Sequence, residues 1–149
     1  MTSTQKPGDV HRFSLRVYYE DTDSVGMVYY ANYLKFAERA RTELLRSLGF
    51  DRWEERFGFT FVVRNCTIDY QQPACLDDLL DVETCLLSLR GASLRIEQKI
   101  RRDGKELVRL QVRIACISED GKVARIPVKL RDALNAFASQ PTSRMRRSA

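Results

Sequence analysis

The 149-residue sequence predicts a single α+β domain in which one long amphipathic helix covers the apolar face of an antiparallel sheet. Three observations predict this fold. One helical apolar stripe occurs in the first third of the chain, several segments alternate apolar and polar residues as strands do, and short turns join most of these segments. Short turns favour antiparallel hairpins, and an amphipathic helix needs an apolar sheet face to cover.

The first strand is expected between His11 and Asp21. Its apolar positions alternate with more polar ones and are Phe13, Leu15, Val17 and Tyr19. The strand runs into Asp21-Thr22-Asp23-Ser24-Val25-Gly26, whose short polar side chains and glycine are typical of a turn or an irregular loop.

A helix of about four to five turns should follow this loop. Its apolar stripe consists of Tyr33, Phe36, Ala37, Ala40, Leu44 and Leu48. The charged residues that lie off the stripe or at its margin are Lys35, Glu38, Arg39, Arg41 and Arg46. Asn32 is one candidate N-cap, a start one turn earlier is the alternative, and Gly49 is well placed to end the helix.

The remaining chain reads as strands until a short helix near its end. Strands are expected at 59–70, 79–90, 94–100 and 108–116, and Asp103-Gly104 predicts a tight hairpin turn before the last of them. The sheet would thus have five to six strands, and its open edges favour dimerisation. A helix over 128–138 completes a folded domain at 12–138, between an N-terminal extension at 1–11 and a basic disordered tail at 139–149.

Composition excludes several classes of function. The net charge is +5, but Arg144, Arg146 and Arg147 in the tail supply three of those charges, so nucleic-acid binding is not indicated. The four cysteines are widely spaced and His11 is the single histidine, which argues against a metal site and favours reduced structural thiols. Without a signal peptide or an apolar run of ~20 residues, the sequence predicts a cytoplasmic protein with no stable membrane insertion.

The single histidine also argues against a Ser-His-Asp or Cys-His catalytic site, and the sequence contains no phosphate-binding or dinucleotide-binding glycine motif. The junction between the first strand and the helix remains. A helix start presents unpaired N–H groups that can stabilise a developing oxyanion, and a nearby carboxylate can attack a carbonyl or activate water. Asp21-Thr22-Asp23 thus has the parts of an acyl-transfer site, although acidic residues before a helix also serve as caps or turn formers.

Longer segments resemble a known family. They are Arg16-Val17-Tyr18-Tyr19-Glu20-Asp21-Thr22-Asp23, Ala31-Asn32-Tyr33-Leu34-Lys35-Phe36, Glu38-Arg39-Ala40-Arg41-Thr42-Glu43, Phe61-Val62-Val63-Arg64 and Leu76-Asp77-Asp78-Leu79. Together with Gly26, Pro73-Ala74 and Arg90-Gly91, they are similar to the signature of hot-dog acyl-CoA thioesterases of the 4-hydroxybenzoyl-CoA thioesterase family, and most similar to its Tol-Pal-associated branch. The resemblance covers roughly residues 12 to 130.

This resemblance implies a hot-dog fold, a central helix wrapped by an antiparallel sheet, in a homodimer or a tetramer of dimers with active sites at the interface. It also implies hydrolysis of acyl-CoA to a free acid and CoA without a cofactor. Asp23 would be the catalytic carboxylate, as nucleophile or general base, and the N–H of Tyr30 an oxyanion donor. Tyr30 stands where the Tol-Pal branch commonly has histidine, which separates this chain from that branch at one site position.

CoA binding is assigned to residues in the matching motifs, namely Arg64, Arg90, Gly91 and Ser93. Solvated arginines and a turn glycine are the alternative interpretation of these positions. Asp77-Asp78 is expected to form a turn rather than a second acid pair. The rival functions are a non-catalytic module that binds acyl-CoA or acyl carrier protein, and a basic interaction protein that uses the arginine tail.

Overall fold

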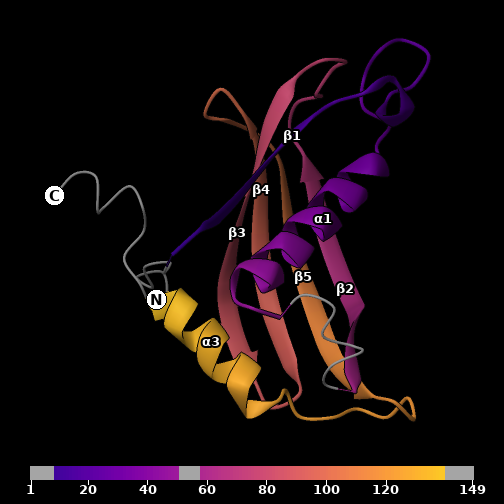
Figure 1. Ribbon diagram of the computed structural model, residues 1–149. Coiled ribbons are helices and arrows are strands. Elements are labelled where there is room, and N and C mark those ends of the chain that lie inside the picture. The colour runs from indigo at the N-terminus through magenta and orange to yellow at the C-terminus, as the bar shows by residue number, and fades with distance from the viewer. Residues whose placement is uncertain (1–8, 51–57, 140–149) are drawn as a thin grey trace, which may run out of the picture.

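The computed structural model describes residues 9–50 and 58–139 (Figure 1). In chain order the elements are β1 (His11–Arg16), the 3-10 helix η2 (Tyr19–Asp21), α1 (Asn32–Ser47), β2 (Phe59–Tyr70), β3 (Leu79–Arg90), β4 (Ser93–Arg102), β5 (Lys105–Ser118) and α3 (Val128–Ser139). The strands form one antiparallel sheet in the order β1-β3-β4-β5-β2, so β1 and β2 are its edges. The predicted α+β architecture is confirmed, with five strands in the described ranges.

Helix α1 lies across one face of the sheet, while α3 lies beside its lower end and contacts β3 (Figure 1). The predicted stripe is buried from Tyr33 to Leu44, and its part from Tyr33 to Ala40 belongs to one apolar core together with alternate residues of β3, β4 and β5. The innermost of these strand residues include Ile100, Val108, Leu110 and Val112. Each large apolar side chain buried here stabilises the fold by about 1.5–3 kcal/mol. Neither of the two α-helices in the described ranges is long and apolar enough to cross a membrane.

A polar network links the helix to the sheet inside this core. Gln98 on β4 is fully buried, and its Nε2 donates to the Ala37 carbonyl at 2.9 Å and to Thr84 Oγ1 at 3.0 Å. Arg41 Nη1 donates to Gln98 Oε1 at 3.0 Å. Arg41 lies at the margin of the apolar stripe, and it is half-buried because it lies one turn after Ala37 on the same side of α1.

The chain leaves β1 earlier than its alternating pattern predicts. Val17 is fully buried and its N–H donates to the Asp78 carbonyl, but the next residues close the turn η2. Asp21 Oδ2 accepts the Tyr18 N–H at 2.9 Å, and the Asp21 N–H donates to the Tyr18 carbonyl. Tyr19 is therefore 81% exposed, and its expected place on the buried face of a strand is wrong.

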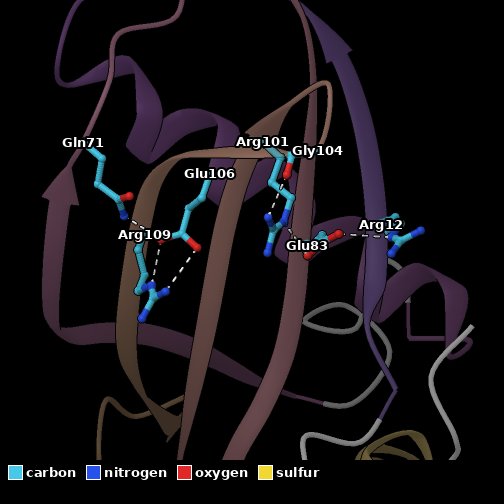
Figure 2. Close-up of polar contacts among 7 residues, drawn as sticks. All are labelled: Arg12, Gln71, Glu83, Arg101, Gly104, Glu106 and Arg109. Carbon is cyan, nitrogen blue, oxygen red and sulfur yellow. Dashed lines mark hydrogen bonds and ion pairs between the residues drawn. The ribbon is translucent and has the colours of Figure 1, made fainter. Parts of the chain in front are cut away.

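Ion pairs join strands on the face of the sheet that is turned away from α1 (Figure 2). Glu83 on β3 pairs with Arg12 on β1 at 3.3 Å and with Arg101 on β4 at 2.9 Å. Arg109 and Glu106 pair at 2.9 Å within β5. Partly exposed pairs of this kind contribute only about 0–1 kcal/mol each, so the apolar face and not this one stabilises the domain.

Strand β2 is an open edge. Among the described residues it pairs only with β5, and a β-bulge at Arg64 interrupts its register between Val63 and Asn65. Val62 and Val63 are exposed beside the bulge. An edge of this length offers unpaired backbone groups to another strand.

Candidate active site

The loop between β1 and α1 lies at the end of the sheet where β2 ends and β3 begins (Figure 1). Its backbone is fixed by isolated bridges from Thr22 to Val28 and from Met27 to Cys75. The Gly26 carbonyl also accepts the N–H of Leu76 at 2.9 Å. Gly26 has φ of +84°, a conformation that favours glycine, so the turn needs this residue.

Asp23 presents an exposed carboxylate on this loop. Its Oδ1 accepts the N–H groups of Val25 at 3.0 Å and Met27 at 3.1 Å. Its own N–H donates to the Met27 carbonyl at 2.7 Å. Oδ2 has no hydrogen-bond partner among the described residues, so one oxygen orients the carboxylate while the other is free to act on a bound molecule.

Asp21, two residues earlier, is 3% exposed, and both of its carboxylate oxygens accept hydrogen bonds from within the protein. Its Oδ1 accepts Asn32 Nδ2 at 2.9 Å, its Oδ2 caps η2, and its carbonyl accepts the Tyr29 N–H at 2.9 Å. Asn32 is the first residue of α1 and its side chain turns back to Asp21, so neither candidate start, with Asn32 as N-cap or one turn earlier, is observed; Ala31 is the N-cap. The pair ties the loop to the helix start.

Tyr30 precedes α1 and is 63% exposed. Its carbonyl accepts the Tyr70 hydroxyl at 2.9 Å. Within the part of the chain that the structure describes, the N–H groups of Tyr30 and Ala31 donate to no acceptor. Unpaired N–H groups at a helix start carry partial positive charge and can stabilise an oxygen that becomes negative.

Asp23 and Tyr30 line the same open groove, which has a volume of about 500 Å³. Its other walls include Met27, Tyr29, Tyr33, Tyr70 and Gln71. The Tyr33 hydroxyl accepts the Ala74 N–H at 3.0 Å, and burial raises the pKa of Tyr33 and of Tyr70, so both hydroxyls stay protonated. The sequence places Tyr33 on the core stripe and Tyr70 at a strand end, and it gives no local signal that either residue belongs to the site.

The residues predicted to bind CoA lie elsewhere in the chain. β3 begins beside the Asp23 loop and ends at Arg90, so Arg90, Gly91 and Ser93 form a turn at the opposite end of the sheet. Arg64 lies in the bulge of β2, between the two ends. The structure therefore brings none of the four to Asp23 within one chain.

A further cation lies beside that distant turn. The Gly91 carbonyl accepts the Ile126 N–H at 3.0 Å, which places Arg125 Nη1 4.0 Å from where a Cβ at Gly91 would be. The turn thus gathers two arginines, Arg90 and Arg125. Sequence reasoning missed Arg125 because it lies in a connection after β5, far from the turn in the chain.

The second acidic pair of the sequence forms the predicted turn. Asp78 Oδ2 accepts the Cys75 N–H at 2.8 Å and pairs with Arg102 Nη1 at 2.7 Å, which leaves it a structural role. Residues 9–50 and 58–139 contain no group of three or more side chains that could hold a metal ion. The four cysteines, all within these ranges, are free thiols.

Comparisons with known proteins agree on one family. The profile of the thioesterase-like superfamily matches residues 17–134. The acyl-CoA thioesterase YbgC of Haemophilus influenzae is 48% identical over 107 residues, which cover 70% of this chain and 79% of the relative. The acyl-CoA thioester hydrolase YbgC of Escherichia coli is 44% identical over 110 residues, or 71% and 81% of the two chains. A solved probable thioesterase from Bartonella henselae superposes with a TM-score of 0.76 at 42% identity over 79% of this chain and 99% of the other.

Proposed function

Because the chain belongs to the thioesterase-like superfamily, we propose that it hydrolyses acyl-CoA thioesters to a free acid and CoA, with Asp23 as the catalytic carboxylate. The hot-dog fold is confirmed by the match to the thioesterase-like superfamily and to the solved probable thioesterase. The observation that carries the proposal is the geometry of Asp23. One oxygen accepts two N–H groups, the other has no partner in the described ranges, and Asp23 lines the same groove as Tyr30, whose N–H has no acceptor there either.

In this proposal the thioester carbonyl oxygen accepts a hydrogen bond from the Tyr30 N–H at the start of α1. The donor stabilises the negative charge that develops on that oxygen. Asp23 then acts in one of two ways. As a nucleophile it forms a mixed anhydride and releases CoA thiolate, and water later hydrolyses the anhydride. As a general base it takes a proton from the water that adds directly to the carbonyl.

The distant CoA residues fit the proposal if two copies pair through their open β2 edges. Antiparallel pairing about a two-fold axis would bring the Phe59 end of one strand beside the Tyr70 end of the other. The turn with Arg90 and Ser93 lies two strands from Phe59, roughly 10 Å away at ordinary strand spacing. It would then face the Asp23 loop of the second copy, with its arginines available to the phosphates of CoA.

Asp23→Asn tests the proposed activity. Free thiol released from a panel of short, long and aromatic acyl-CoAs is measured for both proteins, and we expect a loss of kcat of about 10³-fold because the amide cannot serve as base or nucleophile. Asp132→Asn, an exposed change on α3, is the matched control. A wild-type protein that releases no thiol from any member of the panel, or an Asp23→Asn variant with near-normal rate and no deamidation, would contradict the proposal.

Single turnover in oxygen-18 water separates the two routes. Label in the Asp23 carboxylate supports the anhydride, and its absence supports general-base catalysis. The rival module, which binds acyl-CoA or acyl carrier protein without catalysis, predicts calorimetric binding of acyl-CoA with no thiol release. Membership of the Tol-Pal-associated branch, cytoplasmic location and the oligomeric state remain predictions from the sequence.

A further inference from the structure

Tyr70 connects the end of β2 to the start of α1. Its hydroxyl lies 2.9 Å from the Tyr30 carbonyl oxygen, and its ring packs edge-on against Tyr30 and Tyr33, with centroids 6.4 Å and 5.6 Å away. Tyr70 lines the groove and is 43% exposed, and its hydroxyl is held by the bond to the Tyr30 carbonyl. The contact joins residues 40 positions apart in the chain.

Two successive peptide groups at the helix start are held by their carbonyl oxygens. The Tyr29 carbonyl accepts the Asn32 N–H at 2.8 Å. The Tyr30 carbonyl accepts no backbone N–H among the described residues, because the Leu34 N–H bonds to Ala31 instead, at 3.2 Å. Tyr70 is therefore the group that orients the Tyr30–Ala31 peptide.

The orientation of that peptide decides where a donor points. In a trans peptide the C=O and N–H groups point in opposite directions. With its carbonyl turned toward Tyr70, the Tyr30–Ala31 peptide directs the Ala31 N–H away from Tyr70, and that N–H has no acceptor in the described ranges. A hydrogen bond accepted at the carbonyl also polarises the peptide and makes its N–H a stronger donor.

We propose that the Ala31 N–H is a second donor to the thioester oxygen, next to Tyr30, and that Tyr70 is the positioning residue that holds and polarises the peptide carrying it. This inference rests on the proposed thioesterase function. Tyr70 does not touch the reacting atoms and acts through the Tyr30 carbonyl. It also ties the oxyanion site to the open edge strand β2.

Tyr70→Phe and Ala31→Pro test the two parts of the inference. Tyr70→Phe keeps the ring and removes the hydroxyl, and we expect kcat to fall about tenfold with KM changed less than about threefold, because the lost bond acts mainly on the transition state. Ala31→Pro removes the N–H and keeps the φ of −76° at that residue, although the ring also disfavours the turn conformation of Tyr30, and kcat should fall about 10²-fold. Tyr19→Phe, whose exposed hydroxyl lies outside the groove, is the control and should retain wild-type kcat.

The double variant distinguishes positioning from an independent effect. If Tyr70 acts through the Ala31 N–H, adding Tyr70→Phe to Ala31→Pro causes little further loss, whereas independent effects multiply. A Tyr70→Phe enzyme with kcat within twofold of wild type, a rise in KM alone, or multiplicative losses would each overturn the inference. Wild type and Asp23→Asn are assayed in the same series: an inactive wild type defeats the proposed function, whereas an active one with normal Tyr70→Phe defeats only this inference.

Discussion

The buried hydrogen bond from Asn32 to Asp21 ties the Asp23 loop to the start of α1, and we expect its loss to destabilise the protein measurably. Nδ2 of Asn32, a residue that is 7% exposed, donates to Asp21 Oδ1 at 2.9 Å. Asn32→Leu keeps the number and branching of the side chain's heavy atoms and removes the donor. One carboxylate oxygen of Asp21 is then left buried without its partner.

We expect this substitution to lower the free energy of unfolding by about 2 kcal/mol. A hydrogen bond to a charged group contributes about 1.5–3 kcal/mol, and an unsatisfied buried acceptor costs a similar amount. Leucine is the better helix former, but its advantage over asparagine is roughly a few tenths of a kcal/mol. The lost hydrogen bond is the larger of the two effects, so the variant should be less stable than wild type.

Urea unfolding of both proteins at one pH and one protein concentration measures the difference, since an oligomer's stability depends on concentration. The midpoint should fall with an unchanged slope. Asn135→Leu, an exposed asparagine on α3, is the matched control and should stay within about 0.5 kcal/mol of wild type.

A swap of the two side chains sharpens the test. In the Asp21→Asn/Asn32→Asp double variant, the amide oxygen at position 21 can still accept the Tyr18 N–H, and its NH₂ group can donate to the carboxylate at position 32. The swap should recover most of the stability that either single change loses. The reasoning fails if Asn32→Leu is as stable as wild type, or if the swap loses the sum of the two single effects.

Two further predictions concern charge. Burial lowers the pKa of His11 against the opposing influence of Glu43 and Asp9, so stability should be greatest above the unfolded pKa of about 6.5 and fall as the pH drops through it. When urea unfolding is measured at several pH values, the stability of His11→Phe should vary less with pH than that of wild type. An unchanged variation of stability with pH would contradict this prediction. Arg90→Ala should raise KM for acyl-CoA several-fold at constant kcat and leave acyl-pantetheine unaffected, with Lys129→Ala as control; equal effects on both substrates would refute a phosphate contact.

Local patterns predict most of the fold. The stripe from Tyr33 to Leu44 identifies α1, and Asp103-Gly104 identifies the turn between β4 and β5, where both residues have positive φ, 53° and 80°. The pattern fails at Tyr19 because the alternation continues in the sequence beyond the end of β1, into the turn Tyr19–Asp21 that the Asp21 side chain closes. A side chain that accepts a backbone N–H three residues away can end a strand without changing its apolar rhythm.

The site is less visible in the sequence. Asp21 and Asp23 look alike in the sequence. Only the folded structure shows that Asp21 is buried and bonded to Asn32, whereas Asp23 is exposed. Asp23 as the reacting group and Tyr30 as a donor came from resemblance to a family and remain proposals. Tyr70 and Arg41 escape sequence reasoning because their partners lie 40 and 57 positions away, a distance that no periodicity reports.

The pairing of the edge strand β1 also sets when the site can form. Ser14 on β1 bonds Asp81 on β3, 67 positions further along the chain, while β3 pairs with β4 and β4 with β5, each the next strand in sequence. In the described sheet only these two pairs join strands that follow one another in sequence, and β5 also pairs with the distant β2. Contacts between distant residues close long loops and form slowly, whereas neighbouring hairpins form early. A nascent chain that has emerged from the ribosome only as far as Tyr70 already contains Asp23, Tyr30 and Tyr70. It still lacks β3, the strand to which β1 must bind before the loop can take its place.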